Sequence, residues 1–252
     1  MAAEALNTIR KRIYILNVPV DVLDPEALEA LVEVMLNEGG PHQISLITFW
    51  DIVRAHVDSE YREVLHQSSL VLPITPGIVT SAGFLHKKKP YRYLPFSFII
   101  SLLGVLEKKG KSVYLFGSSK GNIQRAALNL RDSFPGLKLV GRYTGQYGKQ
   151  QEGNILLAIK KASPALLLAG KGVAGGDKWI YKKKKLVNSS ILLWGDDFFE
   201  ISAGKKNRIP KRSFEKGSFV VLQVLRNPLR WVRFPVYIIL GFMLLIYKIR
   251  GL

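Results

Sequence analysis

The sequence predicts an α/β protein with a Rossmann-like, mostly parallel sheet and flanking helices. Short apolar runs rich in strand-forming residues alternate with stretches of helical periodicity, which is the pattern of stacked βαβ units. No internal repeat or low-complexity linker interrupts residues 10–210. We therefore expect one α/β domain over residues 1–210 and a separate basic appendage over residues 211–252.

The elements can be assigned in chain order. The first strand is expected at Arg12–Leu16. Asp24 and Pro25 then supply a helix N-cap and first position, and Gly39 ends that helix. Further strands are expected at Gln43–Ile47, Ser69–Leu72, Ser112–Phe116, Leu137–Val140, Ala165–Ala169 and Ser190–Trp194. Helices are expected at Phe49–Leu65, Ile78–His86, Phe96–Lys109, Asn122–Ser133, Glu152–Lys161 and Asp177–Lys185.

The composition and the charge distribution exclude several classes of function. The 252 residues include no Cys and four His, so cysteine chemistry is excluded and nothing indicates a zinc site. The net charge of +18 is uneven, at +2 over residues 1–126 and +16 over residues 127–252. The second half therefore meets an anionic partner. Basic and aromatic residues are not interleaved along a sheet face, so nucleic acid is not the expected partner.

The C-terminal segment indicates a membrane. Fourteen uncharged residues run from Phe234 to Tyr247, with Arg226, Arg230 and Arg233 before them and Lys248 and Arg250 after them. With snorkelling of the flanking cations, residues 231–249 could form a short span or dip into anionic lipid. The apolar residues lie on all faces, which favours immersion; the alternative is a buried core helix. The N-terminal residues lack a secretory signal, so the domain is expected in the cytoplasm.

Loops that follow strands are the expected ligand sites of an open α/β sheet. Gly117 and Ser118 precede a helix, where backbone N–H groups could hold a phosphate; a plain strand-to-helix connection is the alternative. Gly170 and Gly172 belong to a glycine-rich loop flanked by Lys171 and Lys178, which predicts an anion site or a flexible turn. Glu200 lies in a loop after another strand, where it could bind a metal, act as a general base or cap a helix. Thr75 and Gly77 lie in a turn that has no ionisable group.

From about Arg12 to Phe234 the chain resembles the WecG/TagA/CpsF glycosyltransferases, bacterial enzymes that extend lipid-linked sugars in cell-surface polymer synthesis. The matching blocks are VPVDVLDPEALEALVEVM, SVYLFGSSKGNIQRAALNLRDSFPGLKLVGRYTGQY, FEISAGKKNRIP and LRNPLRWVRF. The resemblance implies metal-independent, inverting transfer of an N-acetylhexosamine from a UDP-sugar to a polyprenyl-diphosphate-linked sugar. It also implies that the protein lies on the cytoplasmic face of the inner membrane and needs no cofactor. A homo-oligomer is compatible with the resemblance.

The resemblance carries over to individual residues. Thr48 falls near the family's Thr/Asn position, Arg92 matches an Arg, and Arg208 keeps the Arg of the RAP block, while Ser97 replaces an Asp. The substrate contacts are expected from Thr75, Gly77, Gly117, Ser118, Gly170, Gly172, Lys178, Glu200 and Arg208. Arg226, Arg230 and Arg233 are placed to meet the diphosphate of the lipid acceptor.

One departure from the family concerns the catalytic base. The family's LPDG aspartate is absent, because residues 72–77 read LPITPG. Asp177, Asp51 and Glu200 are the available substitutes, and Asp177 is favoured because it lies in the glycine-rich loop beside Lys178. The expected catalytic residues are Asp177, Thr48 and Arg92. The alternative is a family member without catalysis that binds sugar nucleotides or lipid diphosphates.

Overall fold

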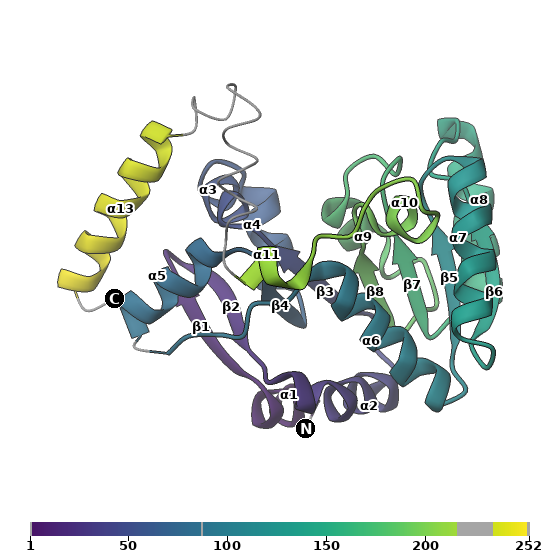
Figure 1. Ribbon diagram of the computed structural model, residues 1–252, viewed down its shortest axis with the longest axis horizontal. Coiled ribbons are helices and arrows are strands. Elements are labelled where there is room, and N and C mark those ends of the chain that lie inside the picture. Colours follow the sequence, from purple (N-terminus) through teal and green to yellow (C-terminus); the bar gives the residue numbers. More distant parts are fainter. Residues whose placement is uncertain (1, 87, 216–233, 251–252) are drawn as a thin grey trace.

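The structure is a computed structural model and describes residues 2–86, 88–215 and 234–250. Its centre is a parallel six-stranded sheet in the order β4-β3-β8-β7-β5-β6 (Figure 1). The strands are β3 (His42–Ile47), β4 (Leu70–Pro73), β5 (Ser112–Phe116), β6 (Lys138–Tyr143), β7 (Leu166–Ala169) and β8 (Ile191–Trp194). The α/β class and the six strands expected after residue 40 are confirmed.

Helices fill the intervals between strands. They are α1 (Ala2–Ile9), α2 (Leu28–Glu38), α3 (Phe49–Val57), α4 (Ser59–His66), α5 (Pro76–His86), α6 (Pro95–Lys108), α7 (Lys120–Ser133), α8 (Glu152–Ala162), α9 (Asp177–Lys183), α10 (Phe198–Ser202), α11 (Lys211–Glu215) and α13 (Phe234–Ile249). Short 3-10 helices occupy Pro25–Ala27 and Lys149–Gln151. The prediction of one helix over Phe49–Leu65 is wrong. Asp58 ends α3 in an extended conformation, and its carboxylate then caps α4 by accepting from the Tyr61 N–H at 2.9 Å.

The first strand forms, but it belongs to a separate sheet. β1 (Lys11–Ile15) pairs antiparallel with β2 (Val18–Val22). Leu16 and Asn17 both have positive φ, which is the backbone of a two-residue hairpin turn. The sequence reasoning missed this hairpin because neither turn residue is a glycine.

A buried carboxylate ties this hairpin to the main sheet. Asp21 of β2 accepts from Arg12 Nε and Nη2, each at 2.8 Å, and from the Val71 N–H of β4 at 2.7 Å. Arg10 also donates to the same carboxylate. Because Asp21 is fully buried, these partners replace the water that it loses on folding.

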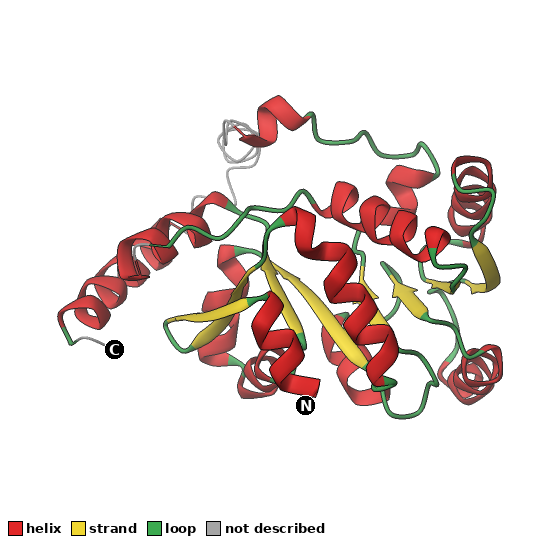
Figure 2. Cartoon of the chain, turned by 90° about the horizontal axis from the view of Figure 1, so that it is seen from below, coloured by secondary structure: helices red, strands yellow, loops and turns green. Residues whose placement is uncertain are grey.

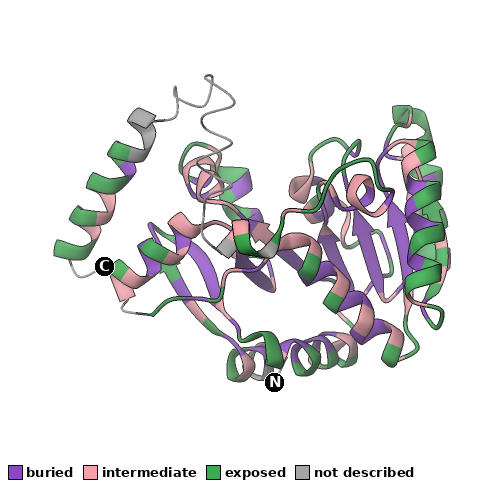
Figure 3. Ribbon diagram, in the orientation of Figure 1, coloured by how far each residue is buried: buried purple, intermediate pink, exposed green. Residues whose placement is uncertain are grey.

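Helices cover both faces of the sheet, as in a doubly wound fold (Figure 2). One face packs with α2, α6, α7 and α10 around a core that includes Ile99 and Leu168. The other face carries α8 and α9 around Phe116 and Trp179. A third cluster joins the hairpin with α3, α4, α5 and α13. Strands β3, β4, β5, β7 and β8 are largely buried on both sides, whereas the edge strand β6 is partly exposed and the helices show one exposed face (Figure 3).

The C-terminal helix α13 packs against the body along one face. Leu240 is buried, and Met243, Leu244 and Tyr247 contact the cluster of the hairpin and α5. The expectation of a helix immersed on all sides is therefore wrong for the described part of residues 231–249. In the described portion of the chain, no helix combines the length and apolar character needed to cross a bilayer. Arg226, Arg230 and Arg233 lie outside the described residues.

Candidate active site

The loops at the carboxyl edge of the sheet bring the predicted residues into one region. From β3 the chain passes to β4 on one side, and from β5 it passes to β6 on the other, so the connections diverge across the middle of the sheet. Open α/β sheets bind ligands at such a point. Thr48 follows β3, Thr75 and Gly77 follow β4, and the glycine loops follow β5 and β7.

Two glycines allow the loops after β5 and β7 to touch. A Cβ at Gly117 would lie 2.8 Å from the peptide nitrogen of Gly170, which is too close for any side chain. Gly172, with φ of +89°, lies against Gly145 in the loop after β6. These positions therefore need glycine for close backbone contact between loops.

Ser118 cross-links three loops. Its N–H donates to Lys171 O, its carbonyl accepts from Gly145 N at 2.9 Å, and its hydroxyl donates to Glu200 Oε1. The Gly117 N–H donates to Tyr143 O at 3.0 Å. These two amides were expected to face a phosphate, and the structure gives them protein acceptors instead. Glu200 thus fixes the β5 loop through Ser118.

The two lysines of the β7 loop are held by carboxylates. Lys171 pairs with Asp197, which raises the pKa of the lysine. Lys178 reaches Asp58 at 2.7 Å and Glu60 at 3.0 Å, both on the α4 side of the sheet. These hydrogen bonds raise the pKa of Lys178. The expected anion site flanked by the two lysines is therefore not assembled by their ammonium groups.

A carboxylate cluster lies beside the end of β3. Asp51 accepts from the Thr48 N–H at 2.7 Å, from the Thr48 hydroxyl at 2.6 Å and from the Tyr61 hydroxyl at 3.0 Å. Thr48 and Asp51 form a capping box at the start of α3. Burial and the Asp51 charge raise the pKa of Tyr61, so its hydroxyl remains a donor.

Asp177 faces this cluster from the first turn of α9. Ser45 Oγ and Gln43 Nε2, both on β3, lie 3.4 and 3.5 Å from Asp177 Oδ1. Burial, and next the negative charge of Asp51, raise the pKa of Asp177 to about 7. A carboxyl group with a pKa near neutrality can accept or donate a proton at physiological pH. The structure thus brings Asp177, Thr48 and Asp51 together, while Lys178 points away toward α4.

Two arginines, Arg92 and Arg208, lie on the side of the β4 loop opposite the cluster of Thr48, Asp51 and Asp177. The Tyr93 N–H donates to Pro73 O at 3.0 Å, which brings Arg92 to the carboxyl end of β4. Its guanidinium lies 4.0 Å over the Phe214 ring of α11 and donates to Phe214 O. Arg208 lies 4.4 Å over the ring of Phe96 at the start of α6. Thr75 Oγ1 accepts from the Phe49 N–H at 2.8 Å, and Gly77 packs on the Phe49 ring.

Some neighbours of the site were missed from the sequence. Gln43 and Ser45 contact Asp177, and Tyr61 contacts Asp51, only because α9 packs against both β3 and α4. No local motif indicates that contact. A capping-box pattern, Thr48 followed three residues later by Asp51, was the one available signal near the cluster.

Fold and site together define a doubly wound α/β protein that presents carboxylates, hydroxyls and arginines where such proteins bind nucleotides. Within this class, the chain belongs to the glycosyl transferase WecG/TagA/CpsF family, whose family model matches residues 13–251. The family resemblance expected from the sequence is confirmed.

Over the aligned regions, named relatives are about a fifth to a quarter identical to the chain. The N-acetylglucosaminyldiphosphoundecaprenol N-acetyl-beta-D-mannosaminyltransferase of Bacillus subtilis (strain 168) is 24% identical over 70% of this chain and 68% of its own length. The protein of the same name from Bacillus spizizenii is 24% identical over 69% and 66%. That of Staphylococcus aureus (strain NCTC 8325 / PS 47) is 20% identical over 60% and 58%. These relatives are named as glycosyltransferases.

Proposed function

We propose that the protein transfers an N-acetylhexosamine from a UDP-sugar to a polyprenyl-diphosphate-linked sugar in the synthesis of a cell-surface polysaccharide. Family membership and the printed names of the relatives support this proposal. The acceptor hydroxyl attacks the anomeric carbon of the donor sugar as the bond to UDP breaks. A base takes the hydroxyl proton, and UDP leaves with the electron pair of the broken bond.

Asp177 is the base in this proposal, and its pKa near 7 beside Asp51 is the observation that supports the role most directly. The turn after β4 has no carboxylate, so the base must come from another loop. Of the alternatives, Asp51 is bound by three donors, and one oxygen of Glu200 accepts from Ser118. Thr48 positions Asp51, and Arg92 is the cation proposed to bind a substrate diphosphate.

The structure also favours attachment to a membrane surface through α13. Six large apolar side chains on its outer face are about half exposed or more: Ile238, Ile239, Phe242, Leu245, Ile246 and Ile249. The exposed Arg250 adjoins this face, whereas the Lys248 ammonium lies over the Phe84 ring of α5 and donates to Phe84 O; an amphipathic surface with a cation at its end suits anionic lipid. The proposed location is the cytoplasmic face of the inner membrane. Arg226, Arg230 and Arg233 would then meet the acceptor diphosphate.

A second candidate is a catalytically inactive binding protein for sugar nucleotides or lipid diphosphates. The absence of a carboxylate between Leu72 and Gly77 is the observation that favours it.

Release of UDP separates the two candidates. Detergent-purified protein is given UDP-N-acetylhexosamines with and without a short-chain polyprenyl-diphosphate N-acetylglucosamine. We expect release that depends on the acceptor. Binding of the UDP-sugar without release from any donor would instead support the inactive binding protein.

A further inference from the structure

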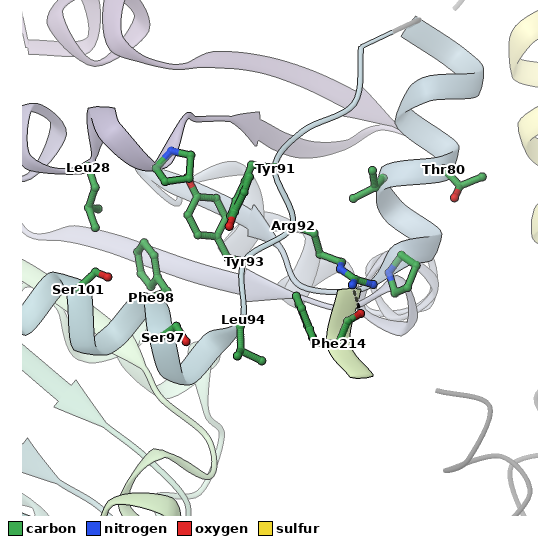
Figure 4. A pocket seen from close by; sticks show the side chains of 13 residues that line it. Leu28, Thr80, Tyr91, Arg92, Tyr93, Leu94, Ser97, Phe98, Ser101 and Phe214 are labelled. Atoms are coloured by element: carbon green, nitrogen blue, oxygen red, sulfur yellow. Dashed lines mark hydrogen bonds between the residues drawn. The ribbon is translucent and has the colours of Figure 1, made fainter. Parts of the chain in front are cut away.

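A cavity of about 570 Å³ lies between α5, α6, the loop over residues 91–94 and α11 (Figure 4). Its volume is in the range of small-molecule binding sites. Pro76 contributes to the wall and directly follows Thr75, so the cavity adjoins the carboxyl end of β4. None of the glycine loops that follow β5 and β7 lines this cavity among the described residues.

Aromatic rings and hydroxyl groups both line the cavity. Tyr93 packs edge-on against both Tyr91 and Phe98, with ring centroids 4.8 and 5.4 Å apart, and Tyr91 is 48% exposed. Ser97 and Ser101 stand one turn apart on α6, and Thr80 lies on α5. In the described parts of the chain, these Ser97, Ser101 and Thr80 hydroxyls make no hydrogen bond to protein. Rings that cover an apolar sugar face and hydroxyls that bind its rim suit a carbohydrate.

One end of the cavity is cationic. Arg92 and Phe214 lie together there, with Leu28 and Ser101 at the opposite end (Figure 4). Arg208 brings a second guanidinium over Phe96, next to Ser97 in the first turn of α6. This fourteen-residue helix directs the positive end of its dipole to the same place. Arg208 lies outside the residues that line the cavity, so the guanidinium that can meet a diphosphate beside the helix N-terminus is that of Arg92.

We propose that the cavity binds the sugar-diphosphate head of the lipid-linked acceptor, with the sugar between Tyr91 and the α6 serines and the diphosphate at Arg92. This inference rests on the proposed function and adds an acceptor site separate from the glycine loops. A UDP-sugar shares the sugar-diphosphate chemistry. The acceptor is favoured because α5, one wall of the cavity, packs against α13, the helix proposed to contact lipid.

The test measures binding of two probes to the full chain in detergent by calorimetry. The probes are farnesyl-diphosphate N-acetylglucosamine and UDP-N-acetylglucosamine. Ser101→Trp places a large ring in the cavity from an exposed helix position, and Arg92→Ala removes the cation. Ser133→Trp, at an exposed position at the end of α7, is the matched control. We expect Ser101→Trp and Arg92→Ala to weaken farnesyl-probe binding at least about tenfold and UDP-probe binding by less than about twofold.

The other outcomes would contradict either the acceptor site or the proposed transferase activity. Equal weakening by Ser133→Trp, unchanged farnesyl-probe binding in both cavity variants, or selective loss of the UDP probe would overturn the acceptor site. UDP release by the unaltered protein is measured in parallel. If the cavity variants lose the farnesyl probe and the unaltered protein releases no UDP, the acceptor site stands and the transferase proposal fails. If release by both variants saturates at the same acceptor concentration as in the unaltered protein, the transferase stands and the acceptor site fails.

Discussion

Asp177 carries the sharpest prediction for a single side chain. Its carboxylate accepts from Ser45 and Gln43 and faces Asp51, so an amide of the same shape preserves the contacts and removes the base. We expect Asp177→Asn to lower kcat by about 10²–10⁴-fold, the range of general-base assistance, with UDP binding unchanged. Single-turnover transfer and UDP calorimetry measure the two quantities. Asp132→Asn on exposed α7 is the control, and unchanged turnover in Asp177→Asn would eliminate this base.

The same pKa predicts two opposite responses to pH. A base must be deprotonated, so kcat/KM should rise as pH increases through about 7. The folded protein holds the Asp177 proton more tightly than the unfolded chain does, so the free energy of unfolding falls between about pH 4 and 7. Asp177→Asn should therefore be more stable than the unaltered protein at pH 8, by about 1 kcal/mol because the side chain is partly exposed. Urea denaturation of both proteins at pH 5 and pH 8 checks this sign; an Asp177→Asn variant that is less stable than the unaltered protein at pH 8 would show that the carboxylate is structural.

Individual side chains were predictable where the chemistry is local. Thr48 could be placed at the end of a strand because it directly follows the predicted strand Gln43–Ile47 and falls near the family's Thr/Asn position. Lys178 could not, because its partners Asp58 and Glu60 are more than a hundred residues away and meet it through packing of α4 on α9. For the same reason Ser118 looked like a phosphate ligand, whereas its polar groups join three loops.

Between elements, the buried Asp21 network should decide whether the hairpin stays on the sheet. Asp21→Asn leaves Arg10 and Arg12 with a neutral partner at a buried site. Removing one partner of a buried ion pair costs about 3–5 kcal/mol, so we expect a loss near that size in chemical denaturation. Asp132→Asn should change stability by less than about 0.5 kcal/mol. A loss that small for Asp21→Asn would mean that water or the Val71 N–H compensates.

The elements themselves followed closely from periodicity. Buried parallel strands such as β7 and β8 read as short aliphatic runs, which the sequence displays directly. Two failures have physical causes. The hairpin turn uses Leu16 and Asn17, so it lacks the usual glycine signal, and Asp58 divides α3 from α4 by serving as the end of one helix and the cap of the next.

For the whole molecule, the positive charge and the apolar helix have to be considered together. The excess of basic residues lies in the second half of the chain, and α13 exposes one apolar face beside Arg250. Hydropathy alone did not distinguish a helix immersed on all sides from one that docks by a single face. The difference comes from Leu240 and Tyr247, which pack on the hairpin and α5.

Phe242 tests the membrane role of that face. Its side chain is 63% exposed, and full burial of a phenylalanine in apolar surroundings contributes about 1.5–3 kcal/mol. We expect Phe242→Glu to weaken sedimentation with vesicles rich in phosphatidylglycerol by at least about tenfold. Leu128→Glu, on a side chain 59% exposed on α7, is the matched control and should bind vesicles as the unaltered protein does. If both variants bind vesicles equally well and Phe242→Glu instead dissociates an oligomer in light scattering, the exposed face of α13 contacts a second copy of the chain rather than lipid.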